Sequence, residues 1–429
     1  DLPPSQLFVP ASAGGTSMLM PPNLGGSITI PSGGSNSDDL TNCANGVALP
    51  APLTRWSILD LDRTLDDLFG AGRTLVSTVP LDDRRYERDL SLGFVEALRA
   101  VARERAQSAV ADTDMFEVCE SEDSDAACIQ PWLRDWGEKL YRRPLTTEQL
   151  EAYVAQFTSA QAELTPAAAA RNSLISMMLS PYFVLRMEIG EPVAGQLTPY
   201  EVAARLSHFA TRSSPDAELM QSAQSGALLE PVERLAQMRR LWQSPAGRFG
   251  RAQQHLEWLD LSENSLPLVL APELRAEMFE QSQRFINDVF DTQHGTLADL
   301  LGSARLPLTP SLAEHYGLPA PTADGFSFVD VEPTESSGLL SQGLFTSAYP
   351  RPTPRGLAIF RGLLCGNVPD HPPSAAADFG DGATPRERIT QGIAGRSECR
   401  ACHDMIDPFG FGLEAFDDQG RLTGFESNA

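Results

Sequence analysis

The sequence has few basic residues, no long apolar run and no phosphate-binding loop, and each absence narrows the possible functions. Its 33 Lys and Arg stand against 57 Asp and Glu, a net charge of −24. This balance disfavours nucleic acid and anionic membrane surfaces as partners and favours basic proteins or cations. No run of 18 apolar residues occurs, so no segment is predicted to span a bilayer. A Gly-x-Ser-x-Gly nucleophile elbow is also missing, and no carboxylate is assigned a catalytic role.

The 429 residues predict about two to four domains, because a single hydrophobic core stops growing near 250–300 residues. Apolar residues recur at three- and four-residue intervals along most of the chain, which predicts a mainly α fold of several helical domains with long ordered loops. The expected parts are an irregular Pro/Gly/Ser-rich arm over 1–50, helical domains over 51–112, 113–192 and 193–265, and a cytochrome c-like domain over 266–429.

Local signals place the elements within these domains. Thr146 and Gln149 form a predicted capping box, and Gly70 is a predicted helix stop. Further helices are expected over 147–160, 165–188, 198–212, 215–226, 230–243 and 246–262. Residues 326–331 alternate and predict a short strand or an extended loop. The prolines and glycines of 346–385 predict a long ordered loop.

The most specific motif is Cys399-Arg400-Ala401-Cys402-His403. Two thiols separated by two residues can each add to a vinyl group of one porphyrin, and the next imidazole then lies under the iron. The motif therefore predicts one covalently bound c-type haem with His403 as an iron ligand. Half of a zinc site and a Cys-x-x-Cys redox pair are the alternatives. The sequence has no second Cys/His pair for zinc, and redox chemistry alone leaves His403 unexplained.

Four cysteines remain, namely Cys43, Cys119, Cys128 and Cys365. Haem c is attached outside the cytoplasm, where disulfides persist, so we expect them to pair. Cys119 and Cys128 bracket an acidic loop and are expected to form one bond, which leaves Cys43 and Cys365 for a second. Buried free thiols are the alternative for either pair.

Several segments together resemble a family of secreted bacterial proteins, best known from planctomycetes and myxobacteria. These proteins consist of serial domains of unknown function that end in a planctomycete-type cytochrome c domain. The segments that carry the resemblance are 141–145, 180–188, 197–219, 312–317, 338–343, 355–356, 363–365 and 399–417. The family usually has a His after its Gln-Gly element, where this chain reads Ser347-Ala348-Tyr349-Pro350-Arg351. The resemblance implies haem and secretion and supplies no reaction.

The sixth iron ligand is expected to come from upstream, because Met405, the sole methionine after His403, is too close to reach the opposite haem face. His315 is the favoured candidate, as a metal ligand or a distal residue, since it lies in a segment that the family shares. A helix-end histidine that satisfies a carbonyl is the alternative. The other imidazoles are His208, expected in the core, and His255, His294 and His371.

The residues that follow the motif are expected to form a turn and to pack on the haem, namely Pro408, Phe409 and Phe411. Their alternative is ordinary core packing. Arg142 and Arg143 are expected to mark an exposed helix end, and holding a haem propionate is the alternative.

Three functions fit these features. The first is electron transfer by a secreted monohaem cytochrome with a redox partner protein. The second is a peroxidase-like or oxygenase-like oxidoreductase with an open haem position. The third is a structural or cell-surface assembly protein in a multiprotein complex. The chain begins at Asp1, which suggests a mature periplasmic or extracellular protein whose signal peptide has been removed.

Overall fold

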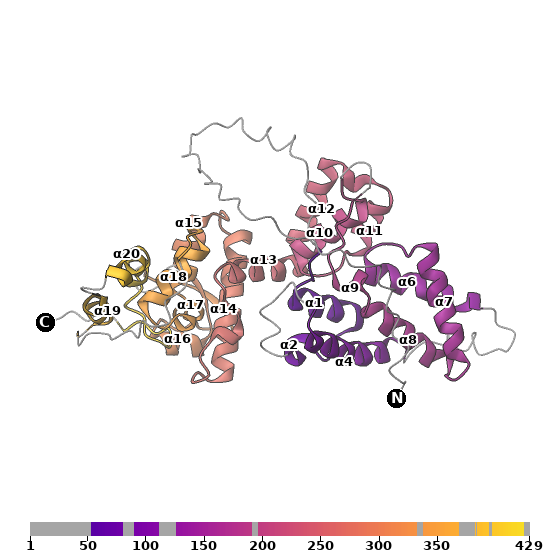
Figure 1. The fold of residues 1–429 in the computed structure, drawn as a ribbon. Helices are drawn as coiled ribbons and strands as arrows, with labels where there is room; N and C mark the ends of the chain where they lie inside the picture. Colours follow the sequence, from indigo (N-terminus) through magenta and orange to yellow (C-terminus); the bar gives the residue numbers. More distant parts are fainter. Residues whose placement is uncertain are drawn as a thin grey trace, which may run out of the picture. The chain divides into compact units, whose positions relative to one another are not determined.

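The computed structural model describes residues 53–79, 90–110, 126–190, 196–332, 338–368, 382, 384–393 and 397–423. Within these ranges the chain is mainly helical (Figure 1), and its strands form one two-stranded sheet. The predicted mainly α fold is confirmed. The predicted arm over 1–50, Cys43, Cys119 and the acidic loop lie outside the described residues.

The helices between residues 58 and 184 share one hydrophobic core. The helices are α1 (Ile58–Phe69), α2 (Leu75–Thr78), α4 (Leu92–Ala109), α6 (Gln130–Tyr141), α7 (Thr147–Gln161), α8 (Pro166–Met178) and α9 (Pro181–Val184). Leu65 on α1, Val101 on α4 and Leu174 on α8 are fully buried in it. The predicted capping box is present at the start of α7, where Thr146 and Gln149 exchange side-chain and backbone hydrogen bonds.

The prediction of one helix over 165–188 is wrong, because the chain breaks between α8 and α9. Pro181 has no N–H to donate to the preceding turn and restricts the residue before it to extended backbone. Ser180 accordingly has ψ of 144°, and its side chain caps α9 by accepting from the backbone N–H of Tyr182.

A second, smaller core joins the middle helices. These are α10 (Pro199–Thr211), α11 (Ala217–Gln224), α12 (Pro231–Gln243) and α13 (Pro245–Trp258). All four predicted helices are present, and α10 begins at a capping box in which Thr198 and Glu201 exchange hydrogen bonds. Ala203, Leu219 and Leu241 lie in this core.

A third core extends from Leu256 to Ile359. It is built by α14 (Pro272–Asp291), α15 (Leu297–Gly302), α16 (Pro310–Tyr316), α17 (Gly343–Ala348) and α18 (Pro352–Gly362), with β1 (Arg305–Leu308) and β2 (Ser327–Asp330). The strand expected over 326–331 is therefore present as β2, and it pairs antiparallel with β1. Short 3-10 helices within the described ranges link the elements: η2 (Ala126–Ile129), η3 (Ala227–Leu229), η4 (Glu263–Ser265) and η5 (Leu339–Ser341).

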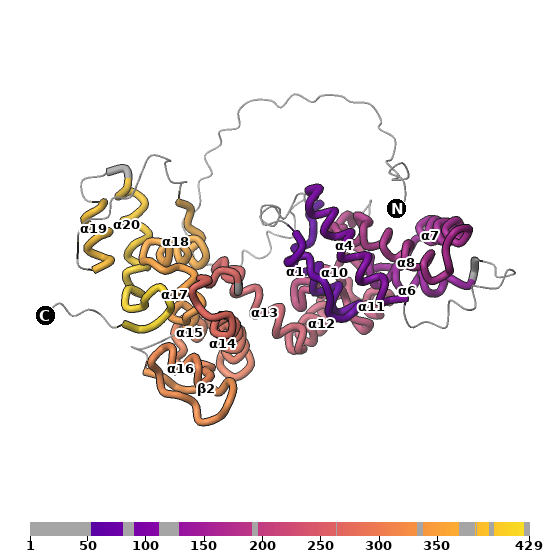
Figure 2. Tube along the Cα trace, turned by 90° about the horizontal axis from the view of Figure 1, so that it is seen from below, coloured from indigo at the N-terminus to yellow at the C-terminus, as the bar shows by residue number. Residues whose placement is uncertain are grey.

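The expectation of a long loop over 346–385 is wrong for its first half, where α17 ends and α18 lies. Pro352 and Pro354 fall in the first turn of α18, where backbone N–H groups have no helical acceptor and proline is tolerated. The chain then continues through α19 (Pro385–Ile393) and α20 (Ser397–Phe411). Figure 2 shows α19 beside α20, and the two helices are in contact.

Candidate haem site

The predicted haem motif lies in the first half of α20. Residues three and four positions apart face the same side of an α-helix, so Cys399, Cys402 and His403 project from one face. Cys399 and Cys402 are free, half-buried thiols. The His403 side chain is 23% exposed. All three groups are therefore reachable from outside the helix, as covalent attachment to a porphyrin requires.

His403 is oriented by a carboxylate one turn further along α20. Its Nδ1 lies 2.8 Å from Oδ2 of Asp407, which is buried. A carboxylate oxygen accepts here, so Nδ1 carries a proton, and in the neutral imidazole Nε2 then keeps its lone pair. The hydrogen bond to Asp407 raises the pKa of His403 above its ordinary value. Histidines that ligate metals usually have this arrangement, with one ring nitrogen donating to a carboxylate and the other free.

The helix α18 supports this arrangement from the neighbouring side. The hydroxyl of Thr353 donates to Oδ1 of Asp407 at 2.7 Å. Two glycines allow the helices to approach closely: a Cβ at Gly356 would overlap the carbonyl oxygen of Ile406, and one at Gly410 would overlap that of Pro352. At this contact Pro352 of α18 meets Gly410 of α20, and Gly356 meets Ile406. Residue numbers therefore increase along one helix and decrease along the other, so the two helices run antiparallel.

The expectation of a turn at Pro408 is wrong, because α20 continues through it to Phe411. An interior proline costs a helix about 3 kcal/mol. Pro408 is exposed, whereas Ile406 and Gly410 are buried and contact α18. We infer that the close packing on α18 offsets the cost of the proline on the opposite side of α20.

The two phenylalanines expected against the haem differ in their surroundings. Phe409 is 40% exposed and lies seven residues after Cys402, so it shares that side of α20. Phe411 is half-buried, and the Arg386 guanidinium lies 4.8 Å from its ring centroid. Haem packing by Pro408, Phe409 and Phe411 stays a prediction, and Phe411 already has a partner within the protein.

Arg355, one residue before Gly356, holds the end of α20 and the segment after it. Its guanidinium is buried and donates to backbone carbonyl oxygens of residues that precede α18 and of residues that follow α20. The acceptors are the carbonyl oxygens of Thr346, Tyr349, Leu413, Phe416 and Asp417. Burial lowers the pKa of Arg355 to about 10, so it stays charged at neutral pH. The sequence shows an Arg-Gly pair but gives no signal for these acceptors.

His315 lies at the end of α16, where its Nε2 is 2.8 Å from the carbonyl oxygen of Gln419. A carbonyl only accepts, so Nε2 carries a proton and has no lone pair for iron in this arrangement. This is the contact expected of a helix-end histidine that satisfies a carbonyl. The ligand role predicted for His315 stays a prediction, and it requires this bond to break or Nδ1 to ligate.

The contacts described for the other imidazoles are with residues outside α20. His208 is buried, as expected, and stacks on Trp56 with ring centroids 3.7 Å apart. Nδ1 of His255 donates to the carbonyl oxygen of Arg251 on its own helix, and the His255 ring contacts Phe290. The His294 side chain is 88% exposed. His371 lies outside the described residues.

The predicted bond between Cys43 and Cys365 is wrong, because Cys365 is a free, exposed thiol. The prediction rests on an even number of thiols, and such a count does not test whether two Cβ atoms come within bonding reach. Cys128 is disulfide-bonded. Its predicted partner, Cys119, lies outside the described residues, so that pairing stays a prediction.

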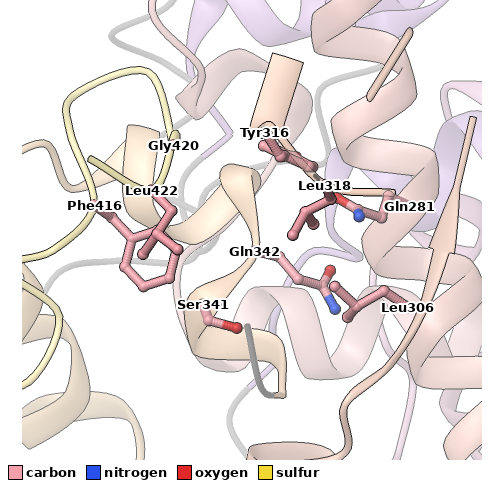
Figure 3. A pocket seen from close by; sticks show the side chains of 9 residues that line it. All are labelled: Gln281, Leu306, Tyr316, Leu318, Ser341, Gln342, Phe416, Gly420 and Leu422. Atoms are coloured by element: carbon pink, nitrogen blue, oxygen red, sulfur yellow. Dashed lines mark hydrogen bonds between the residues drawn. The ribbon is translucent and has the colours of Figure 1, made fainter. Parts of the chain in front are cut away.

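The segment after α20 folds back onto helices that precede the motif. Figure 3 shows Phe416 and Leu422 beside each other, across a small cavity from Gln281 on α14 and Tyr316 on α16. The hydroxyl of Tyr316 donates to Oε1 of Gln281 at 3.0 Å. Together with the His315–Gln419 hydrogen bond, these contacts tie the segment after α20 to the third core.

The residues on α20 fit a c-type haem. They supply two free thiols at the required spacing and one imidazole whose Nε2 keeps a lone pair when the ring is neutral, and no cluster of three His, Cys, Asp or Glu that could hold a metal ion occurs among the described residues. A zinc site would need further ligands of that kind. The donor set thus matches one haem better than it matches zinc.

The fold and this helix define a mainly helical protein with a c-type haem motif on α20. Three family models match it in sequence order, each described as a protein of unknown function. They are PSD5 (DUF1595) over residues 128–188, PSD4 (DUF1592) over 197–318 and PSCyt3 (DUF1588) over 336–426. The chain therefore contains domains of the planctomycete-type cytochrome c domain families, as its sequence resemblance predicted.

No curated protein and no solved structure matches the chain. Among the described residues, no helix is both long enough and apolar enough to cross a membrane.

Proposed function

We propose that the chain is a monohaem c-type cytochrome that transfers electrons to or from a partner protein. Cys399 and Cys402 would hold the haem through thioether bonds, and Nε2 of His403 would bind the iron. The observation that carries the proposal is the hydrogen bond from His403 to the buried carboxylate of Asp407, on the same helix as two free thiols. A bound haem would supply one-electron redox chemistry.

The chain's own residues would set the properties of that haem. Asp407 fixes the tautomer and ring plane of His403 and increases its basicity as a ligand. Thr353 and the α18 contact hold Asp407 in place. The net charge of −24 favours a basic redox partner by electrostatic attraction. Haem c attachment and the family match support a periplasmic or extracellular location.

Intact-mass measurement tests the attachment. The chain is produced in a bacterial periplasm with a cytochrome c maturation system and denatured before analysis. We expect the polypeptide mass plus one haem. Cys365→Ala is the matched control, because Cys365 is a free thiol outside the motif, and it should retain the haem. Cys399→Ala with Cys402→Ala should lose it. A wild-type mass without haem, with both thiols free, contradicts the proposal.

A haem-dependent oxidoreductase with an open distal position is the second candidate. The observation that favours it is the His315–Gln419 hydrogen bond, which engages the Nε2 of the imidazole predicted as the sixth ligand. Absorption spectra of the ferric and ferrous protein distinguish the two candidates. A low-spin spectrum that cyanide and carbon monoxide leave unchanged supports electron transfer. A high-spin spectrum with rapid ligand binding supports the oxidoreductase.

A further inference from the structure

A cavity of about 200 Å³ lies far along the chain from the haem motif. Its walls are residues of 56–204, and none belongs to the segment that matches PSCyt3. A single water molecule needs only about 10–15 Å³ measured in this way. The cavity therefore has room for a small organic molecule.

One wall contains a buried cation that has no counter-ion among the described residues. Arg142 is 3% exposed, so the interpretation of Arg142 as part of an exposed helix end is wrong. Its Nη2 donates to the carbonyl oxygens of Tyr182 and Phe183, each at 2.9 Å. Among the described residues, its Nη1 has no hydrogen-bond partner and no carboxylate forms an ion pair with it. Burial lowers the pKa of Arg142 to about 9, so the group is charged at neutral pH.

The same wall contains a second donor without an acceptor. Trp56 is buried, and its Nε1 has no hydrogen-bond partner within the part of the chain that the structure describes. His208 stacks on this indole and holds its plane. An indole N–H and a guanidinium N–H can only donate. Two unpartnered donors in one wall require acceptor oxygens, and burying them without acceptors is costly.

The acidic side chains of the cavity are engaged elsewhere. Glu201 accepts from the backbone N–H groups of Ile189, Gly190 and Thr198. Glu188 forms an ion pair with Arg186, with 2.9 Å between Nη2 and Oε1. Neither carboxylate is thus available to neutralise Arg142, and the field inside the cavity favours an anion.

The remaining walls suit a flat, weakly polar body. They include the aromatic residues Tyr141, Tyr182 and Tyr200 and the apolar residues Met187, Ile189 and Ala204, beside Arg143 and Thr198. Aromatic and thioether groups pack well on planar rings.

We propose that this cavity binds a small aromatic carboxylate, with its two oxygens facing Arg142 and Trp56 and its ring against Tyr200 and Met187. The site goes beyond the proposed redox function and does not depend on it.

Isothermal titration of the haem-loaded chain with benzoate tests the proposal, with benzamide as the uncharged analogue of the same shape. We expect one benzoate per chain and binding of benzamide weaker by about tenfold or more, because a hydrogen bond to a charged group is lost. Equal binding of the two compounds, or no binding of benzoate at millimolar concentration, overturns the proposal.

Three variants test the location of the site without removing Arg142. Ala204→Leu adds three carbon atoms inside the cavity, whereas Ala152→Leu makes the same change at an exposed position of α7 outside it. We expect Ala204→Leu to abolish benzoate binding and Ala152→Leu to leave it unchanged. Trp56→Phe keeps a ring that can stack on His208 and removes the N–H donor, so it should weaken binding severalfold. Undiminished binding to Ala204→Leu would show that benzoate binds elsewhere. Haem content, measured in parallel, should stay the same in all three variants.

Discussion

Thr353 on α18 donates a hydrogen bond of 2.7 Å to Asp407 on α20, and Asp407 in turn accepts from His403. The orientation of the predicted iron ligand is thus set by a helix that lies outside the Cys-x-x-Cys-His motif. This chain of contacts gives the motif a structural context that its five residues alone do not supply.

Replacing Asp407 by Asn should raise the reduction potential of the haem. The amide is neutral, so it stabilises the ferric state less than a carboxylate does. Outer-shell changes of this kind commonly alter a metal site by about tenfold, which is about 60 mV for one electron. Redox titration followed by absorbance measures the change. Thr353→Val is the control, because it leaves the carboxylate in place and should shift the potential much less. Equal potentials in wild type and Asp407→Asn would contradict the assigned role of Asp407.

Gly356→Ala and Gly410→Ala should each destabilise the haem domain by about 1–3 kcal/mol or more, because the added methyl group overlaps a backbone carbonyl across the α18–α20 contact. Urea unfolding followed by circular dichroism measures the loss. Gly412→Ala is the matched control, since its Cβ would lie at an ordinary contact distance of 3.5 Å from the carbonyl oxygen of Phe409. If all three substitutions have the same small effect, the two helices do not pack as closely as described.

His208 should make folding stability depend on pH. Burial lowers the pKa of His208 well below its ordinary value, so the folded protein holds this imidazole neutral. The unfolded chain binds a proton near pH 6.5, and stability is therefore lost as the pH falls below that value, by up to about 1.4 kcal/mol per pH unit. His208→Phe keeps a ring on Trp56 and removes the titration. Its melting temperature should fall less than that of the wild type between neutral and mildly acidic pH, and parallel falls would contradict the prediction.

His315→Ala should leave the spin state of the haem unchanged, because Nε2 of His315 donates to the carbonyl oxygen of Gln419. The variant should lose about 1 kcal/mol of stability with that hydrogen bond. Ferric absorption spectra provide the measurement. A change from low spin to high spin in the variant would instead establish His315 as the sixth ligand, as the sequence predicts.

The sequence predicts helices well where their ends carry local signals. Thr146 stands directly before an apolar periodic segment and caps α7 as expected. Thr198 caps α10 in the same way, although only the helix, and not its cap, is predicted there. The sequence predicts helices poorly at prolines, because a proline can begin a helix, end one or lie inside one. Pro352 starts α18, and Pro408 lies inside α20. Whether the helix forms around such a proline depends on the element it packs against. An element distant in sequence leaves no local pattern that predicts this contact.

The residues of the candidate site also differ in how well the sequence predicts them. The thiols and His403 are visible as a motif, because haem attachment requires fixed spacing. Asp407 lies four residues after His403, which is helical spacing, but a carboxylate at that distance is common in an acidic chain. The cavity beside Arg142 could not be predicted at all, since its walls come from segments separated by more than a hundred residues.

The close contact of α18 and α20 also bears on how fast electrons could be exchanged. Glycines at the contact bring the two backbones directly against each other. The Arg355 guanidinium donates to five carbonyl oxygens around the end of the helix pair. A haem carried by such a helix would change its charge with little movement of its surroundings. We therefore expect a small reorganisation energy, so that the separation from the partner's redox centre, rather than rearrangement of this domain, limits the rate of transfer.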